Sequence, residues 1–294
     1  MDEGDIRKTG VMELENEERV KFDRLYSTPE RCLDDPADRV SARRLDWNRS
    51  MLIVRRSIAN KTLGTKFGFI WLILDPLAIS LVYLFVFAVI RYQEAPAVIF
   101  IGLGMLRGMQ KALQDGASPA SLSSMHGGFS VFRVRTRVPV TAMILQVGLD
   151  SFLMGIGITA VLITLDVSVF ASFLFIPLLF ISNMLWFGIG LFLLRFTSRV
   201  PDLNKILTYV SMGMFFASPV LYSLDRTTGI HRELNFFNPL TYAIEFSRWT
   251  CDISNGFDLL PVWGYAAIIL AGMALLSVSI RKVDSIRWKF SMES

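Results

Sequence analysis

The stretch GFIWLILDPLAISLVYLFVFAVI, residues 68–90, decides the fold class of this chain. It is apolar almost throughout, and as an α-helix it would extend about 34 Å, enough to cross a bilayer. Asp75 and Pro76 interrupt its first third. A proline removes one helical hydrogen bond, and a carboxylate at membrane depth must face a partner or water. Asp75 therefore either lines a wet conduit or lies close enough to the membrane surface to be hydrated.

The chain contains five further apolar windows, and 52% of its residues are hydrophobic, so the whole chain has the composition of a membrane protein. The sequence predicts six membrane-spanning helices, at residues 68–90, 95–113, 139–165, 170–194, 206–222 and 260–280. The second is the most polar, and we expect Arg107 and Lys111 in its final turns to snorkel to the membrane surface. The predicted fold is an all-α integral membrane protein with a polar tail at 1–42, an amphipathic interface helix at 43–67, the six-span domain at 68–285 and a second tail at 286–294.

The charged residues predict how the chain is oriented. Residues 1–46 hold 13 acidic and 9 basic side chains, which favours a solvated tail, and we interpret DDPAD at 34–38 in the same way rather than as a metal site. Lys and Arg gather at 43–66, 133–137, 195–205 and 281–289, so the positive-inside rule places these segments and both termini in the cytoplasm. We expect no removable signal peptide, and no disulfide between Cys32 and Cys251, which fall on opposite faces.

Two segments outside the spans are too apolar for free loops. RRLDWNRSMLIVRRSIANKTL, residues 43–63, has the pattern of a helix that lies in the headgroup plane or packs on a cytoplasmic partner. Between the fifth and sixth spans, Phe236, Phe237 and Trp249 flank the turn signal Asn238-Pro239. This pattern predicts two short re-entrant helices that dip into the outer leaflet.

Three blocks carry a family resemblance: WLILDPL at 71–77, FFASPVLY at 215–222 and FFNPLTYAIEFSRW at 236–249. With six spans and an amphipathic helix that ends near Gly64, they resemble the type-2 permeases of ABC transporters that export bacterial polysaccharides such as O-antigen, capsule and teichoic acid. The resemblance covers residues 45–290. Arg107 departs from it, since relatives are usually apolar or aromatic there, and Gly127-Gly128 with an Arg-rich run replaces the common Phe-Pro-Arg.

The resemblance implies a permease that moves a lipid-linked polysaccharide across the bacterial cytoplasmic membrane. It implies two copies of this chain with two ATPase subunits, which bind ATP and Mg; membrane lipids are further partners, and nucleic acid is not. The chain itself has no GxxxxGK[ST] loop, HExxH, CxxC or Gly-x-Ser-x-Gly motif, so we expect neither enzymatic activity nor a metal site. A secondary transporter or channel for another amphipathic substrate is the alternative, and a membrane-embedded transferase ranks third.

Several residues are candidates for the substrate pathway. Asp150 either pairs across helices or accepts a hydrogen bond from Gln146, one turn earlier. Tyr209 and Phe216 are seven residues apart and share a helix face, as do Phe215 and Tyr222. The resemblance implies aromatic rings against which sugars stack, although aromatic residues in a span more often face lipid or pack on neighbours. The pathway candidates are Trp71, Asp75, Tyr83, Asp150, Tyr209, Phe216 and Tyr222.

The loop at residues 114–138 is the candidate for coupling to the ATPase. Phe129, Val131 and Phe132 form an apolar knob suited to a partner's groove. Arg133 and the two arginines that follow it lie near lipid phosphates or an acidic rim, or serve only positive-inside retention.

Overall fold

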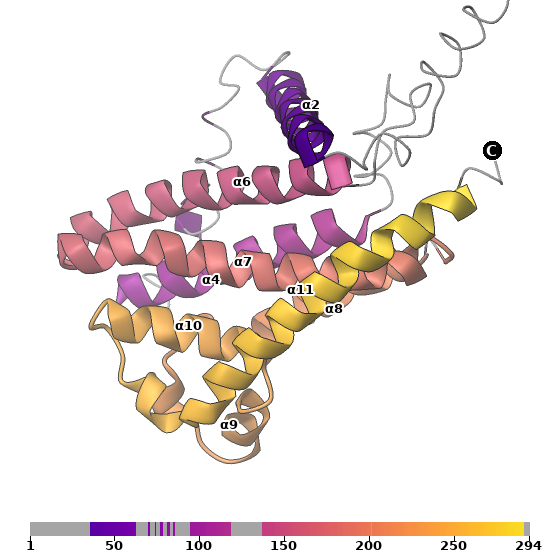
Figure 1. Ribbon diagram of the computed structural model, residues 1–294. Helices are drawn as coiled ribbons and strands as arrows, with labels where there is room; N and C mark the ends of the chain where they lie inside the picture. The colour runs from indigo at the N-terminus through magenta and orange to yellow at the C-terminus, as the bar shows by residue number, and fades with distance from the viewer. Residues whose placement is uncertain are drawn as a thin grey trace, which may run out of the picture. The chain divides into compact units, whose positions relative to one another are not determined.

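The computed structural model describes residues 36–62, 95–118, 137–200 and 202–290, with seven single residues between 70 and 85. Every regular element within these ranges is helical (Figure 1). The elements are α2 (Pro36–Thr62), α4 (Pro96–Ala117), α6 (Arg137–Thr164), α7 (Val169–Thr197), α8 (Asp202–Ala217), η3 (Leu224–Arg226), α9 (Ile230–Asn235), α10 (Pro239–Thr250), η4 (Gly256–Leu259) and α11 (Val262–Phe290). The chain separates into two compact units, Met1–Arg49 and Ser50–Ser294, with the boundary inside α2.

Three helices in the described ranges are long and apolar enough to cross a membrane. They are Val138–Thr164, Val169–Thr197 and Val262–Arg281, which coincide with the third, fourth and sixth predicted spans. α4 matches the second predicted span in position but carries three charged residues, and α8 has 16 residues, or about 24 Å. Most of the first predicted span lies outside the described residues.

The prediction that the fifth helix reaches residue 222 is wrong. α8 ends at Ala217, and residues 218–223 form turns. The physical cause is Pro219, which has no N–H to donate and disfavours helical backbone in the residue before it.

α7 is the helix around which α4, α6 and α11 pack. α11, drawn in yellow, crosses α7 at an angle (Figure 1). Glycines allow these close approaches: a methyl group on Gly190 would lie 3.0 Å from the Cα of Gly116 in α4, and one on Gly188 would lie 3.0 Å from the Cβ of Leu276 in α11. Small residues at helix crossings bring backbones together and maximise van der Waals contact where lipid weakens the hydrophobic drive.

α4 extends from one end of α7 to the other. At its start, the Val98 carbonyl accepts a hydrogen bond from α10. The residue after α10, Cys251, approaches the beginning of α7, with its Sγ 3.7 Å from the Ala171 carbonyl. At the other end, the Thr197 hydroxyl donates to the Ala117 carbonyl. The 22 residues of α4, about 33 Å, therefore follow the length of a membrane-spanning helix.

The second half of α2 packs on the beginning of α6. Ser50 donates its hydroxyl to the Val138 carbonyl at 3.0 Å. Ile53 and Val54 are buried in a small cluster with Val138 and Ala142. Within the unit that starts at Ser50, one apolar face of this amphipathic segment is thus occupied by α6.

Candidate functional site

The blocks SPVLY and NPLTYAIEFSRW meet in space at the beginning of α10. Asn238 accepts a hydrogen bond from the Leu240 N–H at 3.0 Å and so caps the helix. Its Nδ2 donates to the Ser218 hydroxyl at 2.7 Å, which ties the cap to the end of α8. Pro239 occupies the first helical position, where a missing N–H costs nothing. The two blocks are therefore parts of one structural joint.

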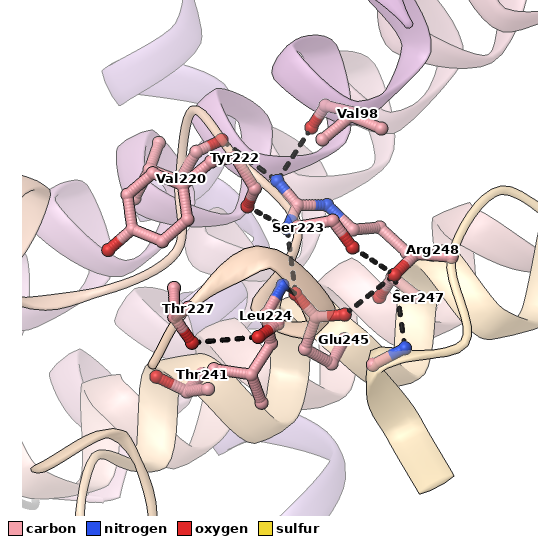
Figure 2. Close-up of polar contacts among 12 residues, drawn as sticks. Val98, Val220, Tyr222, Ser223, Leu224, Thr227, Thr241, Glu245, Ser247 and Arg248 are labelled. Carbon is pink, nitrogen blue, oxygen red and sulfur yellow. Dashed lines mark hydrogen bonds and ion pairs between the residues drawn. The ribbon is translucent and has the colours of Figure 1, made fainter. Parts of the chain in front are cut away.

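Arg248 and Glu245, one turn apart on α10, form an ion pair at the centre of this joint. Their side chains have 0% exposure, and Arg248 Nη1 lies 2.8 Å from Glu245 Oε1. The guanidinium also donates to three backbone carbonyls, those of Tyr222 and Val98 at 2.8 Å and that of Val220 at 2.9 Å. Figure 2 shows these groups converging from separate segments on one side chain. We call Arg248, Glu245 and their partners the buried junction.

Glu245 completes the junction from the other side. Its Oε1 accepts from the Leu224 N–H at 3.4 Å, and its Oε2 accepts from the Ser254 hydroxyl at 3.1 Å. The Ser254 hydroxyl is in turn hydrogen-bonded to Ser223 and accepts from the Gly256 N–H at 3.1 Å. A buried charge pair is tolerated when its other donors and acceptors find partners. Here both Nη atoms of Arg248 and both carboxylate oxygens of Glu245 have them.

The buried junction fixes three segments that are distant in sequence. The backbone after α8 has left the helix, so its carbonyls need new donors, and Arg248 supplies them. The same side chain holds the start of α4. Gly102 shows how tight the contact is, because a methyl group there would collide with the Val220 carbonyl oxygen and lie 2.9 Å from Arg248 Nη2. The arrangement is a structural joint with its polar atoms turned inward.

A second polar feature lies along α4. Sixteen of its 22 residues are buried. Apart from Pro96 at its start, the residues with exposed surface are all polar and fall three or four apart, hence on one side of the helix. We call this set the polar face of α4: Arg107, Gln110, Lys111, Gln114 and Asp115.

Side chains of α6 and α8 contact this polar face. Lys111 Nζ lies 2.8 Å from Asp150 Oδ2 of α6, with the lysine side chain 43% exposed and the aspartate 8% exposed. Gln110 Nε2 donates to the Ser211 carbonyl of α8 at 3.0 Å and accepts from Arg107 Nη1 at 3.3 Å. Unlike the buried junction, this row of charged and amide groups is accessible from outside the chain.

Comparison with known proteins finds a family that part of the chain resembles. Residues 131–251 match the family model described as ABC-2 type transporter. This match covers less than half of the chain, which is similar to the family over that region. The matched region runs from α6 through α10 and therefore contains Glu245, Arg248 and the turns that they bind.

Curated relatives of the chain align over most of their own length. It is 22% identical over 248 residues to the O-antigen export system permease protein RfbA of Klebsiella pneumoniae, covering 82% of this chain and 93% of that relative. It is 23% identical over 189 residues to the polysialic acid transport protein KpsM of Escherichia coli, with 62% and 73% covered. An RfbA protein of Myxococcus xanthus is 27% identical over 193 residues, with 62% and 72% covered.

The predicted pathway residues fall into different surroundings. Tyr209 and Phe216 are 73% and 76% exposed on α8. Tyr222 lies beyond α8, so the prediction that it shares a helix face with Phe215 is wrong. Its hydroxyl lies 3.0 Å from His231 Nε2 instead. Asp150 pairs across helices, which was one of its two predicted alternatives.

The predicted outer segment is helical but unevenly covered. Phe237 is 87% exposed, whereas the carbonyl of Phe236 accepts a hydrogen bond from the Tyr242 hydroxyl at 2.8 Å. Trp249 is 46% exposed and stacks on Phe257, with ring centroids 4.7 Å apart. Asn238 and Pro239 form the α10 cap described above.

The remaining predicted site residues lie outside the described part of the chain. They are Trp71, Asp75 and Tyr83 of the first predicted span, and Phe129, Val131, Phe132 and Arg133 of the predicted coupling loop. Within the described ranges, no group of three or more His, Cys, Asp or Glu side chains is arranged to hold a metal ion.

Sequence reasoning did not single out Glu245 and Arg248, and it assigned Lys111 to the membrane surface. The i, i+3 spacing of an acid and a base within an apolar helix was a readable signal for the first pair. For Lys111 no local signal existed, because its partner Asp150 is 39 residues away on another helix.

Proposed function

We propose that this chain is the transmembrane permease subunit of an ABC exporter that moves a polysaccharide, in lipid-linked form, across the bacterial cytoplasmic membrane. A separate ATPase subunit drives the transport. One observation carries the proposal: the ABC-2 match contains the whole α6–α10 region, and relatives that align over 62% and 82% of the chain are named as a polysialic acid transport protein and an O-antigen export permease.

The proposed topology has six spans with both termini in the cytoplasm. α4 is counted as a span because it follows the full length of α7 and turns its charges to a single side. The first span is residues 68–90, and α8 with the turns after it forms the fifth. α9 and α10 are the re-entrant helices of the outer leaflet, where burial of Leu240, Ile244 and Arg248 ties α10 to the spans.

The re-entrant proposal makes a specific prediction for Phe236, Phe237 and Trp249. Phe237 is 87% exposed in the single chain, so lipid or a second subunit must cover it if the segment lies in the outer leaflet. Phe237→Cys should then react slowly with a membrane-impermeant maleimide, while Thr228→Cys, exposed in the preceding loop, should react fast. Equal fast labelling at both positions would place the segment in water.

The proposed assembly is a homodimer of this chain with two ATPase subunits. Of the 16 residues of α8, only Ser211 is buried, and the helix exposes large apolar side chains at Ile206, Tyr209, Val210, Met212 and Phe216. Two-fold symmetry is the commonest way to cover such a surface and to enclose a pathway between subunits. Native mass spectrometry of the purified complex should find two permease copies, and a single copy would reject the dimer.

The proposed pathway and coupling residues remain those predicted from the sequence. Tyr209, Phe216 and Tyr222, with Trp71, Asp75, Tyr83 and Asp150, are proposed to face the substrate. We propose that the ATPase contacts Phe129, Val131, Phe132 and Arg133. A permease without nucleotide-binding motifs must couple to the conformational change of its ATPase through its cytoplasmic surface. Replacing Phe129 and Phe132 together with Ala should weaken co-purification of the ATPase, since buried aromatic anchors dominate such interfaces; unchanged binding and export would move the docking site elsewhere.

A deletion strain tests the function itself. Cells that lack this chain should lose the surface polysaccharide and accumulate lipid-linked glycan inside, and the wild-type gene should restore export. A strain whose ATPase partner is inactivated should show the same defect. Normal surface glycan in the deletion strain would reject the proposal, and export that persists without the ATPase would favour a secondary transporter or channel.

A further inference from the structure

The polar face of α4 carries one cation whose charge is not balanced within the described part of the chain. Lys111 is neutralised by Asp150, with the charged atoms 2.8 Å apart. Arg107, one turn earlier, has no carboxylate within ion-pairing distance among the described residues. Its Nε is buried and makes no hydrogen bond there. The guanidinium is therefore desolvated on one side without a countercharge.

The position of Arg107 is nevertheless fixed by its neighbours. Its Nη1 donates to Gln110 Oε1 at 3.3 Å, and the amide of that glutamine is anchored by donation to the Ser211 carbonyl of α8 at 3.0 Å. α8 thus holds Gln110, and Gln110 orients the guanidinium. A side chain that merely avoided lipid would not need such support.

The depth of Arg107 excludes simple snorkelling. It lies 11 residues after Pro96 and 10 before Ala117, so it is roughly 15 Å from either end of α4. An arginine reaches the surface only from positions near a helix end. At this depth a cation is costly unless it faces water or an anion.

The geometry points to Arg107 as a binding residue for an anionic group of the transported substrate, a phosphate or a carboxylate, at the polar face of α4. The planar guanidinium binds both groups through paired N–H donors, and such bonds are strong where water is scarce. This inference rests on the proposed function, because the anion reaches α4 only if the substrate passes along it. It adds a charge requirement for the substrate to that function.

Binding to the purified permease–ATPase complex in nanodiscs tests this assignment. The probes are farnesyl pyrophosphate with farnesol as its neutral counterpart, and a galacturonate hexamer with maltohexaose. Arg107→Gln should weaken binding of at least one anionic probe about tenfold and leave the neutral probes unchanged, whereas Arg107→Lys should retain more of the affinity. Arg195→Gln, which removes an exposed arginine from the end of α7, is the matched control and should bind as wild type.

The outcomes separate the two sources of the anion. Loss confined to farnesyl pyrophosphate assigns Arg107 to the lipid-linked phosphate, and loss confined to the hexamer assigns it to an acidic sugar. Binding of both anions that is unaffected by Arg107→Gln, or absent from the wild type, overturns the inference. Export in cells separates this failure from that of the proposed function. If the wild-type chain restores export and Arg107→Gln exports equally well, only the role of Arg107 fails.

Discussion

Two ion pairs in the described part of the chain, Arg248–Glu245 and Lys111–Asp150, differ in what surrounds them. Arg248 and Glu245 are completely buried. Three backbone carbonyls, from α4 and from the turns after α8, bind Arg248, and the Leu224 N–H binds Glu245. Lys111 and Asp150 are bound as closely, but the lysine is 43% exposed on the polar face of α4. The first pair has no route to water or substrate and acts as a joint. The second lies beside a surface where charges can meet a ligand.

Removing Arg248 should have the largest effect on stability. Arg248→Ala leaves the Glu245 carboxylate buried without its countercharge and deprives three carbonyls of their donor. The expected loss is about 3–5 kcal/mol, measured as thermal unfolding of the purified permease. The stability of Arg248→Lys should lie between those of the wild type and Arg248→Ala, because lysine keeps the charge but lacks the paired N–H donors of the guanidinium.

The control for this prediction is Arg195→Ala, which removes an exposed arginine and should leave the unfolding midpoint unchanged. If Arg248→Ala is as stable as this control, the buried junction does not hold the fold.

A glycine pair tests the same joint from the side of α4. Gly102→Ala would place a methyl group against the Val220 carbonyl and Arg248, so we expect a loss of about 1–3 kcal/mol from overpacking. Gly213→Ala in α8 meets no atom within 4 Å and should gain up to about 1 kcal/mol from helix propensity. Thermal unfolding of both variants checks the contrast, and a neutral Gly102→Ala would mean that α4 approaches the junction less closely.

The sequence predicted the long apolar helices because hydropathy alone determines them. α6, α7 and α11 match their predicted spans within a few residues at their starts. α8 was predicted too long because an apolar window continues through Pro219, where backbone geometry ends the helix. Apolar composition thus predicted that α8 is a helix, whereas the position of its end was set by Pro219 alone.

The candidate site was less predictable because it depends on contacts between distant segments. The carbonyls of Val98, Val220 and Tyr222 bind Arg248 through their backbone, and backbone positions leave no mark in side-chain patterns. Asp150 was recognised as a residue that needs a partner, but its pairing with Lys111 requires the packing of α4 on α6. The polar face of α4 was visible as charges in the second span, and its exposure required the structure.

Asp150 should show a smaller effect on stability than Arg248. Asp150→Leu removes the partner of Lys111, but the lysine is partly exposed, so solvent screens its charge. We therefore expect the free energy of unfolding to fall by about 1 kcal/mol or less. Export should fall more clearly, because the charge balance of the polar face changes, and Asp150→Asn should be milder because it keeps a hydrogen-bonding group. Export and thermal unfolding measured on both variants check this; normal export by the Leu variant would make the residue incidental.

Measuring water access along α4 is the most direct test of the difference between the two ion pairs. Arg248–Glu245 is sealed inside the fold, whereas we propose that Lys111–Asp150 lies beside a water-accessible pathway. Single cysteines at Gln110 and Gln114, on the polar face, and at Met109 and Leu113, on the buried face, would be exposed to a membrane-impermeant maleimide in intact cells and in inside-out vesicles. The two glutamine positions should react and the two buried positions should not. Equal reactivity at all four positions, or none at any, would contradict a polar face that lines a water-filled path.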